Sequence, residues 1–148
     1  MIKVAIACPQ EAVPIDRQRL RETARAVLEG EGENDAEISL AFVDNATIHA
    51  LNKRYLDHDE PTDVLSFPLS GPGERKLAGE LVIGAEVARA QADERGHDVQ
   101  AELALYVIHG LLHLCGFEDS DERQATAMHD RERHYLRQLG WPDVAPTE

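Results

Sequence analysis

The sequence feature that most constrains the fold is an apolar run at residues 103–115, which contains no charged side chain. The run is too short for a membrane-spanning helix, which needs about 20 predominantly apolar residues. A helix that is apolar nearly all round is buried in a protein core. Gly116 follows the run and supplies a helix stop, because glycine adopts the left-handed conformation without steric penalty. We therefore predict a buried helix over residues 99–115.

This run also carries two histidines, His109 and His113, four residues apart. Side chains at this spacing lie on one helix face, so their ring nitrogens can converge on one ion about 2 Å from each. The alternative is a pair of core histidines bonded to backbone carbonyls, which needs a separate partner for each ring in a dry environment. We favour the metal because one cause explains both residues.

A third candidate ligand, Asp119, follows shortly after the glycine that ends the helix. With His109 and His113 it makes a site of three protein ligands, and such a site keeps a position open for water, as in catalytic zinc centres. Glu118 is the neighbouring competitor, and the turn after Gly116 decides which of the two carboxylates faces the histidines. The sequence therefore predicts one Zn²⁺ per chain, held by His109, His113 and Asp119.

The spacing of the two histidines is metzincin-like, but the general base of a peptidase is missing. Zinc peptidases of the His-Glu-x-x-His type place a glutamate directly after the first histidine. This chain has Gly110 at that position, and glycine cannot accept a proton. A metallopeptidase is therefore kept only as a less favoured alternative.

Length and composition indicate one domain over residues 1–148, located in the cytoplasm. We predict no signal peptide and no membrane-spanning segment. The two cysteines, Cys8 and Cys115, do not make a disulfide framework. A formal charge of −13, from 15 basic and 28 acidic residues, argues against broad non-specific binding of nucleic acid. It leaves room for a local basic patch on one face.

Hydrophobic periodicity and capping residues predict strands that alternate with helices. The predicted strands cover residues 2–7, 37–43, 63–69 and 77–85. The predicted helices cover residues 14–28, 45–55, 86–95 and 99–115, and a last amphipathic helix begins at a Ser120 cap and ends at Gly140. His129 and His134 lie on the polar part of this last helix and are expected to face solvent. The alternation indicates an α/β or α+β fold with a single sheet.

Three blocks of the sequence resemble the YbeY family of bacterial rRNA maturation factors. The first is the histidine motif at residues 109–117, the second joins residues 51–55 to residues 59–68, and the third is residues 79–83. The order and spacing of the blocks agree with the family over nearly the whole chain. The resemblance implies a mixed four-stranded sheet packed with helices.

The same resemblance implies a zinc-dependent endoribonuclease that cuts single-stranded RNA. Enzymes of this family act in maturing the 3′ end of 16S rRNA and in late-stage ribosome quality control. The expected partners are therefore rRNA, the small ribosomal subunit and assembly factors, without any membrane. The alternative from another class is a non-catalytic ribosome assembly factor with a bound metal, although a structural zinc usually has four protein ligands.

The chain departs from the family pattern at two positions. The usual third ligand is a histidine where this chain has Asp119, and a carboxylate oxygen is an acceptable zinc ligand. An arginine usually follows the tyrosine of the second block, where this chain has Leu56. If that arginine steadies phosphate, its role must pass to Arg54, Lys53 or another basic residue.

The expected reaction is phosphodiester cleavage by a metal-bound water, with a cation that stabilises the charge developing on the phosphorane. The candidates for this chemistry are Arg54, Asp63 and Ser66, and His58 is a further candidate to line the cleft. Asp63 and Ser66 are also explained by hydrogen bonding at a turn and a strand end. The basic patch expected to dock RNA consists of Lys53, Arg54, Arg75 and Lys76.

Overall fold

Within residues 1–146, which the computed structural model describes, the chain forms one four-stranded sheet and five helices. The strands are β1 (Ile2–Ala7), β2 (Ala36–Val43), β3 (Val64–Pro68) and β4 (Leu77–Gly84). The helices are α1 (Arg17–Gly30), α2 (Asn45–Leu56), α3 (Ala85–Arg95), α4 (Val99–Leu114) and α5 (Glu122–Gln138). This α+β arrangement confirms the predicted fold class.

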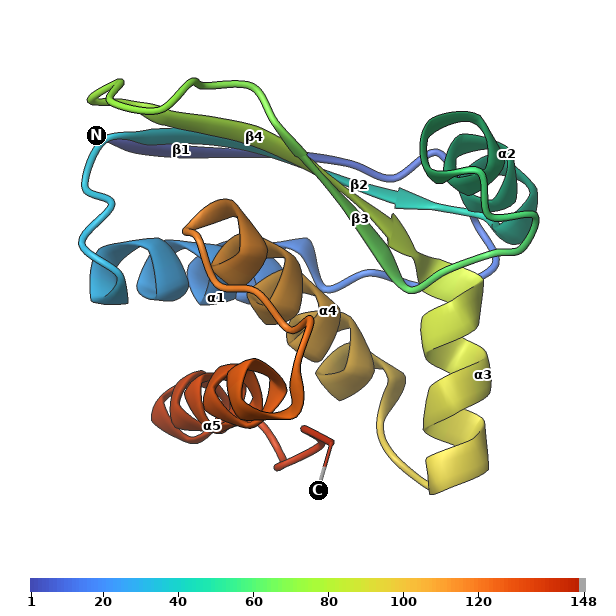
Figure 1. Ribbon diagram of the computed structural model, residues 1–148. Coiled ribbons are helices and arrows are strands. Elements are labelled where there is room, and N and C mark those ends of the chain that lie inside the picture. The colour runs from blue at the N-terminus through green and yellow to red at the C-terminus, as the bar shows by residue number, and fades with distance from the viewer. Residues whose placement is uncertain (147–148) are drawn as a thin grey trace.

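The sheet is mixed, with the strand order β1-β2-β4-β3 (Figure 1). The strands β1, β2 and β4 run parallel, and β3 pairs with β4 in the antiparallel direction. Parallel neighbours need a crossover connection, and α1 provides it between β1 and β2. Pro68 ends β3, which lies at an edge of the sheet, where the missing N–H of proline costs no ladder hydrogen bond.

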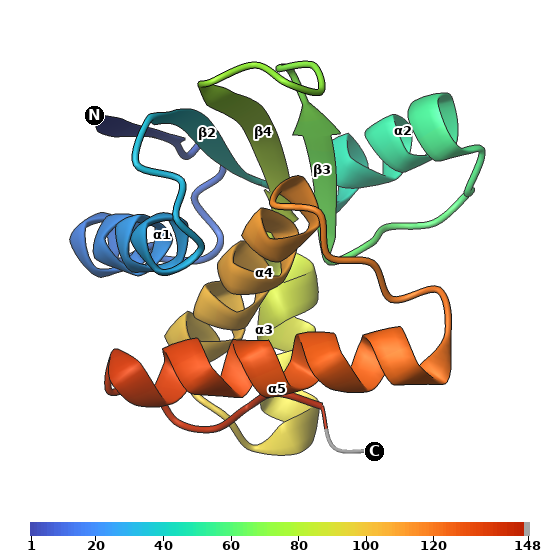
Figure 2. The ribbon, with the colours of Figure 1, turned by 60° about the vertical axis from the view of Figure 1, so that its left-hand side comes forward.

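Alternation along the strands gives the sheet two different faces. Leu40 of β2 and Leu81 of β4 are buried in the main core, which α1 and α4 complete. Val43 and Val82 pack in a second cluster together with Ile48 of α2. The helix α5 contacts α4 on the side away from the sheet (Figure 2). The helix α4 is therefore enclosed between the sheet and a further layer of helix.

The apolar sequence of α4 is buried along nearly its whole length, as predicted. It lies close to the sheet at Gly110, where an added Cβ would be 2.9 Å from Leu81 Cδ2 and 3.1 Å from Val64 Cγ2. Glycine at this position therefore permits the close approach of helix and sheet. No helix in the described part of the chain is both long and apolar enough to span a membrane.

Three helix starts differ from the prediction, and α3 differs by only one residue, since it begins at Ala85 rather than at residue 86. The helix α1 begins at Arg17 rather than at residue 14, because the Asp16 side chain caps it by accepting a hydrogen bond from a backbone N–H of its first turn. The cap of α5 is Asp121 rather than Ser120. The Asp121 carboxylate accepts a hydrogen bond from the backbone N–H of Gln124 at 2.8 Å, whereas the Ser120 hydroxyl bonds only to the Gln124 side chain. A carboxylate also interacts favourably with the positive end of the helix dipole.

The loop that precedes β3 is held tightly against the end of β4. The backbone N–H of Gly84 donates a hydrogen bond to the carbonyl oxygen of Asp63 at 2.8 Å. A Cβ added to Gly84 would lie 2.6 Å from the carbonyl oxygen of Thr62. Glycine at position 84 therefore lets residues 61–63 approach the sheet, and this loop lines the pocket described below.

We predict that Gly84→Ala lowers the free energy of unfolding by about 1–3 kcal/mol, because a clash with backbone cannot be relieved by a rotamer change. Chemical denaturation measures this difference. Gly71→Ala is the matched control, since its Cβ would meet only the end of the exposed Glu74 side chain. We expect it to change stability by less than about 0.5 kcal/mol. Equal effects of the two substitutions would contradict the close packing of this loop.

Candidate metal centre

One turn of α4 places His109 and His113 on the same face, with their Nε2 atoms 3.1 Å apart. The chain reverses at Gly116, whose φ is +105°, and returns to the helix at Asp119. Asp119 Oδ2 lies 3.7 Å from Nε2 of His109 and 3.6 Å from Nε2 of His113. The structure therefore brings together the three residues that the sequence predicted as ligands. Glu118 is exposed and lies outside this cluster.

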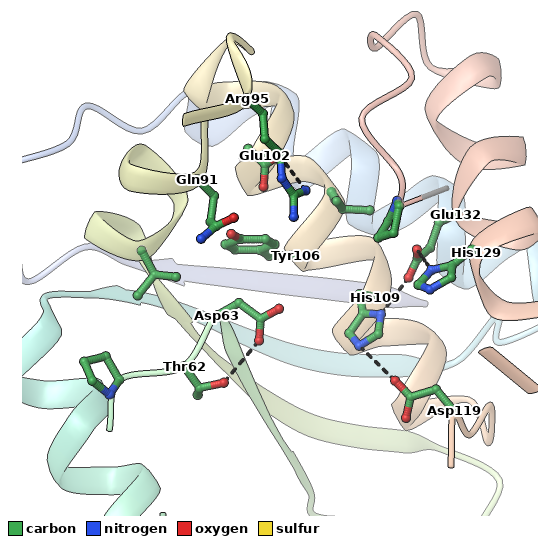
Figure 3. Close-up of a pocket in the computed structure, with 14 residues that line it drawn as sticks. Thr62, Asp63, Gln91, Arg95, Glu102, Tyr106, His109, Asp119, His129 and Glu132 are labelled. Carbon is green, nitrogen blue, oxygen red and sulfur yellow. Dashed lines mark hydrogen bonds and ion pairs between the residues drawn. The ribbon is translucent and has the colours of Figure 1, made fainter. Parts of the chain in front are cut away.

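The opposite nitrogen of each imidazole is held by an oxygen. His109 Nδ1 lies 2.6 Å from Oε2 of Glu132 on α5, and His113 Nδ1 lies 3.0 Å from the carbonyl oxygen of Phe117 (Figure 3 shows the first of these contacts). An ionised carboxylate and a carbonyl only accept hydrogen bonds, so both Nδ1 atoms carry a proton. In the neutral rings, the two Nε2 atoms then present their lone pairs to each other.

Two facing lone pairs with a carboxylate beside them repel one another unless positive charge lies between them. The ligand atoms are spaced for such a charge. Four ligands around zinc, each roughly 2.0–2.1 Å from the ion, are about 3.3 Å apart in a tetrahedron. The three separations here are 3.1, 3.6 and 3.7 Å. Two imidazoles and one carboxylate, with Glu132 and Phe117 orienting the rings from outside, fit a zinc ion.

The electrostatic environment of His109 also favours positive charge. Burial lowers the pKa of His109, but the hydrogen bond and charge of Glu132, aided by Asp63 and Asp119, outweigh burial and raise this pKa above its ordinary value. The same carboxylates would stabilise a bound cation. Burial, aided by nearby glutamates, raises the pKa of the Cys115 thiol to about 12, so this cysteine stays protonated and is a poor metal ligand.

A pocket of about 570 Å³ opens beside the histidine cluster. Its walls come from the loop before β3, from α3, from α4 and from the chain after α4 (Figure 3). His109 and Asp119 line one end of the pocket, and Glu102 and Arg95 line the other. A substrate in this pocket would therefore contact both the histidine cluster and a second group of polar side chains.

The four candidates for catalysis and cleft lining lie in different places. Asp63 lines the pocket, although its Oδ1 also accepts hydrogen bonds from the backbone N–H of Val64 at 2.7 Å and from Thr62 at 3.2 Å. The Ser66 hydroxyl donates to the Gly110 carbonyl oxygen at 3.2 Å and joins β3 to α4. Arg54 and His58 are exposed, and neither they nor Ser66 line the pocket. Of these candidates, the structure therefore places Asp63 alone beside His109.

The predicted basic patch is divided into two pairs. Lys53 and Arg54 lie at the end of α2, whereas Arg75 and Lys76 lie in the loop between β3 and β4. These two regions are at opposite ends of the β3–β4 hairpin (Figure 1). The members are also partly neutralised, since Lys53 Nζ lies 3.8 Å from an Asp59 oxygen and Lys76 Nζ lies 3.1 Å from a Glu37 oxygen. The four residues do not form one patch.

The sequence interpretation missed Glu132 and misplaced His129. Glu132 is fully buried, and its two oxygens bind His109 and His129. The prediction that His129 faces solvent is wrong: its side chain is 16% exposed and its Nδ1 lies 2.9 Å from Glu132 Oε1. His134 is exposed, as predicted. One feature of the sequence indicates that Glu132 is buried. Glu132 lies one turn after Met128 and one turn before Leu136, on the apolar stripe of α5.

We predict that Asp119→Ala weakens metal binding by at least about tenfold to a hundredfold, because it removes one of three candidate ligands. Asp119→His should keep the metal, since an imidazole is an equally good zinc ligand. Glu118→Ala is the matched control and should leave metal affinity unchanged. Competition with a chromophoric chelator gives the affinities. If the Glu118 variant loses the metal and the Asp119 variants keep it, the third ligand is Glu118 and the assignment of Asp119 is wrong.

Comparisons with known proteins show the family of this chain. The family described as Endoribonuclease YbeY matches residues 5–140. A protein called Endoribonuclease YbeY from Pelotomaculum thermopropionicum is 42% identical over 81% of this chain and 84% of its own length. Another of that name from Carboxydothermus hydrogenoformans is 39% identical over 88% and 93%, respectively. A solution structure from Thermotoga maritima, 24% identical, shares the fold with a TM-score of 0.66 over 94% of this chain and 89% of its own. The chain therefore belongs to the YbeY family.

Proposed function

We propose that this chain is a metal-dependent endoribonuclease that cuts single-stranded RNA, with one Zn²⁺ bound by His109, His113 and Asp119. The observation that carries the proposal is the pair of Nε2 atoms 3.1 Å apart, while both Nδ1 atoms are held by oxygens. Imidazoles oriented by outer acceptors in this way are typical of metal ligands. The name of the relatives, Endoribonuclease YbeY, supports RNA as the substrate.

The cellular role that we propose is maturation of the 3′ end of 16S rRNA, together with late-stage ribosome quality control in the cytoplasm. Its partners in this role would be the small ribosomal subunit and assembly factors. Membership of the YbeY family supports this role, because the family match covers residues 5–140. The proposed chemistry is supported separately, by the geometry of the histidine cluster.

Several residues of the chain have defined tasks in the proposed cleavage. A bound Zn²⁺ would supply Lewis acidity at the scissile phosphate. Glu132 and the Phe117 carbonyl oxygen fix the two imidazoles with Nε2 facing inward. Asp63 projects into the same pocket from a loop that Gly84 holds in place. We therefore assign to its carboxylate the task of accepting a proton from the attacking water.

Arg54 is not the cation that stabilises the charge developing on the phosphorane. Its guanidinium lies 5.3 Å from the centre of the Tyr55 ring, on the exposed end of α2. Among the described residues that line the pocket, Arg95 is the one arginine or lysine, and it lies at the end opposite Asp119. The family has an arginine where this chain has Leu56, and the suggested task of that arginine is to steady the phosphate. In this chain we assign that task to the bound cation rather than to a neighbouring side chain.

The surface of α2 and β3 supports binding of unpaired bases. The Tyr55 residue is 55% exposed, and its ring meets the Phe67 ring edge-on at 5.5 Å between centroids. Arg54 lies beside the same ring. An exposed aromatic ring next to arginine is a stacking platform for single-stranded nucleic acid. The loop that follows α2 continues to Asp63, which lines the pocket.

The two alternatives fit the site less well. A structural metal in a non-catalytic assembly factor would be expected to have four protein ligands, and the cluster within residues 1–146 has three. A metallopeptidase would need a base after the first histidine. Position 110 faces Leu81 and Val64 of the sheet, so a glutamate there would collide with the core.

We predict that the zinc-loaded protein cleaves unstructured RNA and leaves casein intact. Asp63→Asn should lower the rate of RNA cleavage by about 10²–10⁴-fold, the usual contribution of a general base, while metal content stays the same. Gel assays of both substrates, with and without a chelator, measure these outcomes. Metal-dependent cleavage of casein with intact RNA would reverse the assignment. A metal-bound protein that cleaves neither substrate would favour the non-catalytic assembly factor.

A further inference from the structure

Glu102 is a buried carboxylate that has no hydrogen-bond partner in the described structure. Its side chain is 1% exposed, and neither Oε1 nor Oε2 accepts a hydrogen bond. The nearest positive groups are Arg95 Nη1 at 3.8 Å and His97 Nε2 at 3.7 Å, both beyond hydrogen-bonding distance. A buried charge left in this state costs several kcal/mol, by order of magnitude. Glu102 is therefore prepared for donors that come from outside the chain.

The position of Glu102 connects it to the proposed reaction. It lies two helical turns before His109 on α4, about 10 Å along the helix axis. Both residues line the same pocket, with Glu102 at the end away from Asp119 (Figure 3). This separation is comparable to the span of a nucleotide from its phosphate to the far edge of its base. A phosphate beside the histidine cluster would therefore place a base near Glu102.

We infer that this end of the pocket is a guanine subsite, in which the Glu102 carboxylate accepts hydrogen bonds from N1–H and the N2 amino group of a guanine base in the RNA substrate. The inference rests on the proposed function for the identity of the substrate. It adds a base preference to that function, and it assigns the preference to one residue.

The choice of guanine follows from the donors that each base carries. A carboxylate with two free oxygens accepts two parallel hydrogen bonds. Guanine has two adjacent donors on its Watson–Crick edge. Adenine and cytosine each place a ring-nitrogen acceptor beside their amino group, and uracil has carbonyl oxygens on both sides of its N–H. These acceptors would face an oxygen of Glu102 and repel it.

The remaining walls suit a guanine as well. Arg95 and Gln91 on α3 line the pocket at the same end as Glu102 and carry donors for guanine O6. Val87 and Leu105 supply apolar wall for the faces of the ring. Burial, the charges of Glu102 and Asp63, and an interaction of the Tyr106 hydroxyl with the Glu102 side chain raise the pKa of Tyr106. The hydroxyl therefore keeps its proton, and it lies beside Glu102 without making a hydrogen bond of normal geometry to it.

The first test varies the ligand and leaves the protein intact. The 3′-monophosphates of guanosine, inosine, adenosine, cytidine and uridine are titrated into the zinc-loaded full chain, and dissociation constants are measured by NMR. All five share the phosphate, so differences report on the base. Guanosine should bind at least about tenfold more tightly than the others, because each lost hydrogen bond to the carboxylate weakens binding about tenfold. Inosine lacks only the N2 amino group. Equal affinity for guanosine and inosine would overturn the inference.

The second test varies the carboxylate. Glu102→Gln should remove the preference for guanosine, because the amide turns one acceptor into a donor that faces guanine N–H. Glu94→Gln is the control, with the same change of charge at an exposed position of α3. Cleavage sites on a mixed-sequence RNA separate this inference from the proposed function. If the protein cleaves RNA without a preference for guanine, the guanine subsite is wrong but the proposed function stands. If it cleaves no RNA, the proposed function is wrong, and the nucleotide-binding measurements alone then test the guanine subsite.

Discussion

The burial of α4 is the constraint on which the site depends. A helix that is apolar on nearly every face has to be enclosed, and here it lies between the sheet and α5. Any imidazole on such a helix needs a partner for both nitrogens. Glu132 and the Phe117 carbonyl oxygen satisfy the outer nitrogens, and the inner nitrogens face each other. The core thereby creates a place for a cation.

The carboxylates that line the pocket make it negatively charged, and this charge opposes the binding of RNA phosphate. Asp63, Glu102, Asp119 and Glu132 line it, against a single arginine among the described lining residues. A phosphate approaching these groups would be repelled. A bound divalent ion would offset the negative charge at the end of the pocket near Asp119. A base edge rich in hydrogen-bond donors would bind the carboxylate at the other end. The acidic composition of the chain is therefore compatible with RNA cleavage when the phosphate is bound through a metal.

The sequence was sufficient to predict the fold class, the extent of α4 and the meeting of His109, His113 and Asp119, because these follow from periodicity, burial and a glycine stop within one short segment. It did not predict Glu132, His129 or Glu102 as pocket residues. Their positions depend on how α3 and α5 pack against α4, which is a tertiary relation between distant segments. The prediction of one basic patch was wrong for the same reason. Arg54 and Arg75 lie in neighbouring segments of the sequence, but the fold places them at opposite ends of the β3–β4 hairpin.

The most direct test of the account is the metal content of the purified protein, measured by elemental analysis. We predict about one zinc per wild-type chain, as a site of three protein ligands implies, and almost none in the variant that combines His109→Ala with His113→Ala. His134→Ala, which changes an exposed histidine of α5, should retain the metal. Equal metal content in the wild type and the double variant would contradict a metal site built on α4.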